Sequence, residues 1–158
     1  MLKFAKIENE QTKAVSVGIG TDIEFYKSIG MTEMEVEKGY DGQWYLQGYA
    51  PQKSIEEVQA EIQKQLTEAV QRILDSKAQE LLYDNCLSVC SYINTDVPKF
   101  DAEGKAFRAW RSAVWVKGYA ILAEVQEGKR EIPSEEALIA ELPELTIVYK
   151  ETDTPNSM

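Results

Sequence analysis

The side chains best able to do chemistry in this chain are two cysteines, Cys86 and Cys90, which lie four residues apart. On a helix this spacing places both thiols on one face, and thiolates are common zinc ligands. The chain has no histidine and no third cysteine, so a closed zinc site would lack its remaining ligands. Residues four apart on a helix are also poorly placed for a disulfide. We expect both cysteines to be small apolar core residues, with no metal.

The lack of histidine also bears on catalysis. Ser-His-Asp and Cys-His sites need an imidazole, which is the usual general base near neutral pH. The carboxylates stand at positions typical of helix caps and polar helix faces, as in Glu56-Glu57 and Glu135-Glu136. A hydrolytic pair needs two acids that face each other across a cleft, whereas these acids have capping or solvating roles. We expect a protein that is not an enzyme and binds no cofactor.

Aromatic and basic residues gather at Phe107, Arg108, Trp110, Arg111 and Trp115. Such a cluster can stack nucleobases or a sugar. The formal net charge is −10, however, and phosphate binding needs clustered Lys and Arg. We therefore expect neither nucleic acid nor an anionic membrane surface as a partner. We interpret the cluster as core aromatics flanked by arginines in salt bridges.

Length and composition are those of an ordinary globular chain. The 158 residues include 44% hydrophobic and 28% charged side chains, which is too apolar for general disorder. The start MLKFAKIENE lacks the apolar run of a signal peptide, and no stretch approaches the roughly 18 apolar residues of a membrane span. We expect reduced cysteines in a cytoplasm and no membrane partner.

Residues 1–51 are expected to form a small antiparallel β module. Strands in LKFAKI and KAVSVGI flank the polar turn ENEQT, because both segments are rich in β-forming residues. A short helix follows, capped by Thr21, with Ile23, Tyr26 and Ile29 turned inward.

A second hairpin follows, which turns at Asp41-Gly42, the pair that favours a two-residue type I′ turn. With that turn, Trp44 and Leu46 fall on the face opposite Val36. Small sheets normally need a helix against one face. We therefore favour a Trp44 covered by the next helix over a Trp44 exposed to a partner.

The next helix is expected to open at Ser54, which forms a capping box with Glu57. Apolar residues then recur at steps of three and four, as on one buried helix face, at Ile55, Val58, Ile62, Leu66, Val70 and Ile73. Core packing is the expectation. A coiled-coil partner is the alternative, although the steps break a strict heptad.

Further helices are expected in a helical domain at 52–143. One begins after Asp84 and holds both cysteines, and one spans about 102–127 behind a cap at Asp101. Gly118 lies in the apolar stripe of the second of these, where the missing side chain lets another helix approach closely.

After this helix we expect one more helix and a short C-terminal segment. Ser134 is the expected cap of the last helix, and Pro143 ends it. The segment 144–158 is expected to hold a short strand at 145–149 and then a polar, disordered tail. The predicted class is α+β, with a small N-terminal antiparallel β module joined by a long helix to a C-terminal helical bundle.

Two segments resemble proteins of tailed phages. The first lies within 4–51, contains FYKSIGMTEMEVE and WYLQGYAP, and is similar to a module that opens many small prophage-encoded proteins. The second lies between Val70 and Pro143 and contains YDNCLSVCSYIN, FDAEGKAFRAWRSAVW, GYAILAEVQEGKREIP and SEEALIAELP. It resembles a phage helical domain of unknown function. The resemblance implies a tail fibre assembly protein, a chaperone that helps fibres fold and trimerise or that stays on the fibre tip.

Two features depart from the resembling domains. Those domains often have Arg-Gly before the Tyr-Asp pair, where this chain has Leu81-Leu82 before Tyr83. This chain also continues past Pro143. The first feature makes the helix junction more apolar, and the second leaves the role of the C-terminal segment open.

The leading prediction is a non-enzymatic binder of a tail fibre or other tail protein, acting in the host bacterial cytoplasm during phage assembly. The alternatives are a structural tail or baseplate component of the virion and a phage inhibitor of a host protein. A homo-oligomer is a further option. The residues predicted to bind the partner are Trp44, Leu46, Ile55, Val58 and Ile62.

Overall fold

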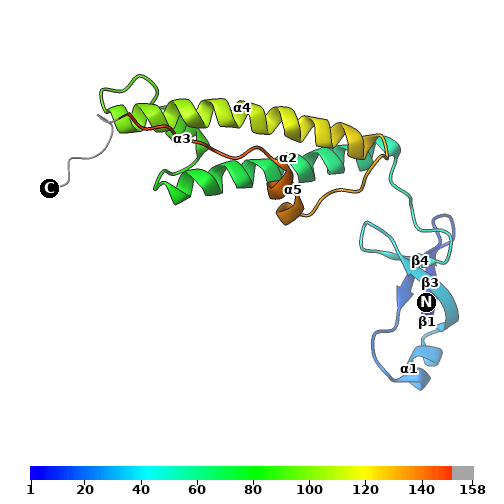
Figure 1. Cartoon of the computed structure of the whole chain (residues 1–158). Coiled ribbons are helices and arrows are strands. Elements are labelled where there is room, and N and C mark those ends of the chain that lie inside the picture. The colour runs from blue at the N-terminus through cyan, green and yellow to red at the C-terminus, as the bar shows by residue number, and fades with distance from the viewer. Residues whose placement is uncertain (151–158) are drawn as a thin grey trace. The chain divides into compact units, whose positions relative to one another are not determined.

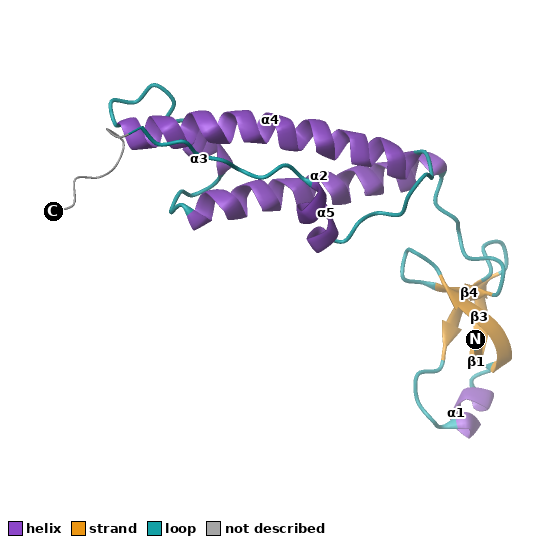
Figure 2. Ribbon diagram, viewed as in Figure 1, coloured by secondary structure: helices purple, strands orange, loops and turns teal. Residues whose placement is uncertain are grey.

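The computed structural model describes residues 1–150, which belong to two compact units (Figure 1). The first unit comprises Met1–Glu57, and the second begins at Val58, after the boundary expected at residue 51. All strands of the described residues lie in the first unit, and two long helices dominate the second (Figure 2). The expected α+β class is confirmed.

The first unit is a small antiparallel barrel. Its strands are β1 (Leu2–Asn9), β2 (Ala14–Val17), β3 (Thr32–Lys38) and β4 (Trp44–Leu46). They follow the order β1-β2-β4-β3, and β3 pairs back to β1. Both expected hairpins are present, and closure of the sheet removes its free edges. The core consists of Ala5, Val15 and Val36, with Ile7, Val17, Met34 and Trp44 packed against it.

The loop of the second hairpin is one residue longer than predicted. The Gly39 amide donates to the Gln43 carbonyl oxygen at 2.7 Å, and the Gly42 amide donates to the Gly39 carbonyl oxygen at 3.0 Å. Gly42 has a φ of 83°, in the left-handed region. The loop therefore has three residues, 40–42, with glycine where a left-handed residue is needed.

This register exchanges the faces of the strand. Val36 pairs with Leu46 and Lys38 pairs with Trp44. A shift of one residue moves every side chain of a strand to the other face. Trp44 and Leu46 therefore share the face of Val36, contrary to the prediction, and Tyr45 takes the other face.

The short helix α1 (Ile23–Ser28) is present, with a different cap and different packing. Asp22 caps it in place of Thr21, because the Asp22 carboxylate accepts a hydrogen bond from the Phe25 amide at 3.0 Å. The helix buries none of its residues, and both Ile23 and Ile29, expected to face inward, are exposed.

The second unit is a bundle built on α2 (Ile55–Glu80) and α4 (Pro98–Gln126), which run side by side in Figure 1. Two short helices, α3 (Cys86–Cys90) and α5 (Glu135–Glu141), complete it. The largest side chains fully buried in its core are Leu74, Phe107, Ile121 and Leu138. No helix among residues 1–150 is both long and apolar enough to cross a membrane.

The capping signals of α2 and α3 have different outcomes. The capping box of α2 is confirmed, because the Ser54 amide donates to Glu57 at 3.0 Å and the Glu57 amide donates to Ser54 Oγ at 3.1 Å. In α3 the cap is Asn85 rather than Asp84, and the Asn85 side chain accepts from the Ser88 amide at 2.8 Å.

Helix α4 begins at Pro98, earlier than expected, since proline is well tolerated in a first helical turn. Asp101 therefore lies inside the first turn and accepts from the Asn94 amide at 2.6 Å instead of capping the helix. The close approach expected at Gly118 is confirmed. A Cβ at that position would lie 3.3 Å from a methyl carbon of Val70 in α2.

The segment after α5 forms no strand among the described residues, so the strand expected at 145–149 is wrong. The segment runs as an extended chain along the helices (Figure 1). Trp110 Nε1 donates to the Pro143 carbonyl oxygen at 2.6 Å, and Leu142 and Leu145 pack against the bundle core. The segment is thus held by side chains of the helices rather than by a partner strand. The polar tail expected after it lies outside the described residues.

Candidate partner-binding surfaces

The two cysteines occupy the α3 helix and face the bundle core. Cys86 is fully buried, Cys90 is half-buried, and both thiols are free. Burial, with a smaller contribution from Cys90, raises the pKa of Cys86 to about 12, while the nearby Arg111 acts in the opposite direction. A thiol that stays protonated is a poor nucleophile. Residues 1–150 contain no cluster of three or more His, Cys, Asp or Glu side chains that could hold a metal ion.

A buried carboxylate lies elsewhere in the bundle. Glu103 is 2% exposed, near the phenols of Tyr83 and Tyr149. Burial first, and then the charge of Glu103, raise the pKa of Tyr83 to about 12. The Tyr83 hydroxyl has no hydrogen-bond partner among residues 1–150, so we assign the effect of Glu103 to charge at longer range. With this pKa the Tyr83 phenol stays protonated near neutral pH and is a poor general base.

The apolar stripe of α2 divides into an exposed and a buried part. Ile55 is 75% exposed and Val58 is 42% exposed, whereas Ile62 is half-buried against the bundle core. Further along the stripe, Leu66 and Val70 are buried and Ile73 is half-buried. The two residues at the start of α2 are therefore the members of the predicted set most accessible to a partner.

The other two predicted residues belong to the barrel. Trp44 and Leu46 are half-buried, and Trp44 packs against the barrel core. The Nζ atoms of Lys3 and Lys38 lie 5.2 Å and 6.0 Å from the centre of a Trp44 ring. Cations over an indole face stabilise it electrostatically. Trp44 thus has a structural role within its own unit.

The sequence patterns missed an exposed apolar surface on α1. Phe25 is 54% exposed and Ile29 is 43% exposed, and they stand four residues apart, on one side of the helix. Ile19, in the loop before the helix, is 95% exposed. The signal in the sequence was the unusual number of large apolar residues in so short a helix. We call Phe25 and Ile29 the α1 apolar face.

Tyr26 anchors α1 to the barrel. Its ring lies over Gly18, where a Cβ would come within 2.7 Å of it, and its hydroxyl accepts a hydrogen bond from the Gly20 amide. The ring also stacks on Phe4, with ring centroids 6.3 Å apart. Since Tyr26 holds the helix, the α1 apolar face is not needed to attach it.

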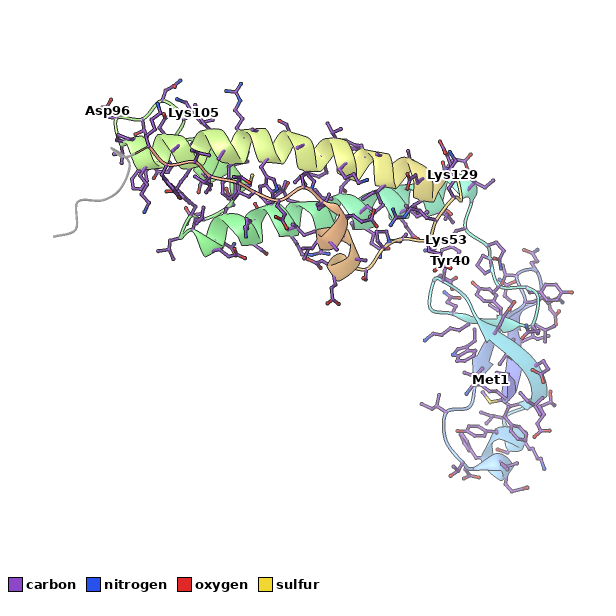
Figure 3. The ribbon with its side chains drawn as sticks, in the orientation of Figure 1. Met1, Tyr40, Lys53, Asp96, Lys105 and Lys129 are labelled. Atoms are coloured by element: carbon purple, nitrogen blue, oxygen red, sulfur yellow. The ribbon has the colours of Figure 1, made fainter. Side chains whose placement is uncertain are left out.

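Tyrosines of the barrel loops add exposed aromatic surface. Tyr40 is 57% exposed and Tyr49 is 53% exposed. Figure 3 shows Tyr40 beside Lys53, whose Nζ lies 5.2 Å from the centre of the ring. A lysine over one face of the ring leaves the other face available for contact.

The arginines predicted to form salt bridges beside the α4 aromatics have none. Within the described chain, neither Arg108 nor Arg111 has a carboxylate oxygen within 4.0 Å of its guanidinium nitrogens. The aromatic part of the prediction is confirmed for Phe107, which is fully buried, and for Trp110, which is 7% exposed. The salt-bridge part is wrong, because no described acid lies close enough to pair with either guanidinium.

Comparison of the chain with family models, with curated proteins and with solved structures finds no match. The resemblance of the two segments to phage proteins therefore remains a prediction. The surfaces described above are the basis on which a function can be argued.

Proposed function

We propose that the protein is a phage or prophage tail fibre assembly protein, a non-enzymatic, chaperone-like binder of a tail fibre protein. The observation that carries the proposal is the α1 apolar face. It is made of Phe25 and Ile29, which belong to FYKSIG, part of the run that resembles the prophage module.

Different residues of FYKSIG have different roles. Tyr26 packs on the barrel, and Gly30 has a φ of 86°, which suits the end of a helix. Phe25 and Ile29 are about half exposed, although the Phe25 ring also contacts that of Tyr26 at 5.9 Å. Burying a large apolar side chain against a partner is favourable by about 2 kcal/mol. We infer that these neighbouring exposed apolar side chains form part of an interaction site.

The start of α2 gives a second surface of the same character at Ile55 and Val58. Fibre chains expose apolar surface before they trimerise, and a chaperone protects such surface by covering it until the chains assemble. Apolar side chains set among acidic residues such as Glu56, Glu57 and Glu61 suit reversible contact of this kind.

Co-expression with the tail fibre gene next to its own, followed by pull-down and sizing, tests the proposal. We expect a complex of defined stoichiometry, and a fibre that is insoluble without it. The double variant Phe25→Ser and Ile29→Ser should lose the complex. Val116→Ser is the matched control, because Val116 is 73% exposed and belongs to α4, not to the α1 apolar face. A soluble fibre that forms no complex would discard the proposal.

Mass spectrometry of purified virions separates the proposal from its main alternative. An assembly protein that leaves the particle should be absent from virions. A structural tail or baseplate component would be present in fixed copy number.

A further inference from the structure

A hollow of about 450 Å³ lies between α3 with the turn that follows it and the middle of α4. Its lining comprises Cys90, Ile93, Arg108, Arg111, Ser112 and Trp115. The four α4 residues follow one another at steps of three, one and three, which places them on one side of the helix. We call this the α3–α4 hollow.

The α3–α4 hollow is cationic in an acidic protein. Both of its charged lining residues are arginines, and neither has an ion-pair partner within residues 1–150. Other arginines of the bundle are paired, since Arg72 lies 3.5 Å from Glu135 and Arg130 binds both Glu124 and Glu141. The arginines without an ion-pair partner among the described residues are therefore the two that line this hollow.

The walls of the hollow combine charge with apolar surface. Trp115 on α4 and Ile93 in the turn after α3 are both half-buried and line the hollow. Arg111 lines the hollow together with Cys90 of α3, so its guanidinium lies on the side of α4 that borders α3. A guanidinium pairs with a carboxylate through two parallel hydrogen bonds, and an indole face packs against an apolar or aromatic group.

Charge decides which class of ligand is favoured. A nucleic acid carries many phosphates, and the net charge of −10 repels such a polyanion at distances beyond the hollow. A single carboxylate next to an apolar side chain can bind the two arginines and Trp115, and it carries no further negative charges for the rest of the protein to repel. A short acidic segment of a protein has this chemistry.

We propose that the α3–α4 hollow binds an acidic peptide segment of a partner protein, with Arg108 and Arg111 holding one Asp or Glu carboxylate and Trp115 packing against a neighbouring apolar side chain. The site lies on the helical unit and is separate from the α1 apolar face. It stands whether or not the partner is a tail fibre.

The test is an NMR titration of the full chain, labelled with ¹⁵N at its three indoles, with the dipeptide acetyl-Glu-Phe amide. The signal of Trp115, assigned with the Trp115→Phe variant, should shift and saturate. Trp44 lies in the barrel, and the Trp110 indole is bonded to the Pro143 carbonyl, so both of their signals should stay in place. Acetyl-Gln-Phe amide, which lacks the charge, should bind at least tenfold more weakly.

Variants of the arginines complete the test. Arg108→Gln and Arg111→Gln should each weaken binding about tenfold, the usual loss for one charge-assisted hydrogen bond. Arg72→Gln, at an exposed arginine outside the hollow, should bind as the parent does. Arg108 is exposed, so its variant keeps the fold even if Arg111→Gln does not, and thermal unfolding checks both.

Three results would overturn the proposal. Equal affinity for the Gln and Glu dipeptides would show that the arginines do not recognise the carboxylate and that the hollow binds only the apolar side chain. Unchanged binding in the Arg108→Gln variant, or a Trp115 signal that does not move, would place any ligand elsewhere. Inorganic phosphate that binds more tightly than the dipeptide through the same arginines would make this a phosphate site and not a peptide site.

Discussion

At the scale of residues, Tyr45 shows how one side chain stabilises a turn. It is 6% exposed, and its ring lies over Gly39, where a Cβ would come within 2.8 Å of it. Its hydroxyl donates to Asp41 Oδ2 at 2.6 Å, while Asp41 Oδ1 accepts from the Gln43 amide at 3.0 Å. The hydrogen bond from Tyr45, followed by that from Gln43, lowers the pKa of Asp41 below its usual value of 3.8.

Replacing Tyr45 by Phe should raise the pKa of Asp41 back toward its usual value. A lowered folded-state pKa stabilises the fold above the unfolded-state pKa, and that contribution is lost as the pH falls through the lowered pKa. The parent barrel should therefore lose stability below about pH 4, and Tyr45→Phe should show a smaller loss there. NMR titration of the Asp41 carboxyl carbon measures the pKa directly. An unchanged pKa in the variant would refute the role of the hydroxyl.

At the scale of elements, glycines set how closely the helices of the bundle pack. Gly104 and Gly118 are both buried on α4. A Cβ on Gly104 would lie 3.0 Å from the Val89 carbonyl oxygen, which is backbone, and 3.1 Å from Ile93. At Gly118 the nearest atom is a side-chain methyl of Val70, at 3.3 Å. A methyl can move aside, whereas a backbone oxygen is held by its helix.

Gly104→Ala should therefore destabilise the bundle and Gly118→Ala should not. Alanine in a helix interior is favoured over glycine by about 1 kcal/mol, and overpacking costs about 1–3 kcal/mol. We expect overpacking to exceed the helix gain at Gly104 and roughly to cancel it at Gly118. Urea denaturation of both variants measures the difference. If Gly104→Ala were as stable as Gly118→Ala, α3 would have to move away from the added methyl group at little cost in free energy.

At the scale of the whole molecule, the two units have separate cores. The barrel core rests on Ala5, Val15 and Val36, whereas the bundle core includes residues from all four of its helices. A small core supplies less stabilisation, so the barrel should depend heavily on each of its buried residues.

Val36→Ala should lower the free energy of unfolding of the barrel and leave that of the bundle unchanged. Removing the buried methyl groups of Val36 costs about 2 kcal/mol, a large fraction of the stability of so small a unit. Amide hydrogen exchange of the full chain reports on both units in one experiment. Leu74→Ala is the converse control, since Leu74 is fully buried in the bundle. Loss of protection in both units of the Val36→Ala protein would show that they unfold together.

Local signals in the sequence determined much of this protein. The capping box at Ser54 and the close approach at Gly118 depend on residues near in sequence or on the absence of a Cβ. The α+β class and the two hairpins follow from β-forming runs, turn residues and helical periodicity. The thiols were assigned to the core because the chain lacks the further ligands that a metal site would need.

The tertiary structure decided what depends on distant contacts. Asp41-Gly42 suits a two-residue turn and also a three-residue loop with glycine in the left-handed region. The register that forms is one in which β4 also pairs with β2, through Ala14 with Tyr45 and Val15 with Trp44. Helix periodicity indicates which face of α4 is apolar but not where the acids of other helices lie. The lack of ion-pair partners within residues 1–150 for the arginines of the α3–α4 hollow and the exposure of the α1 apolar face could therefore be learned only from the tertiary structure.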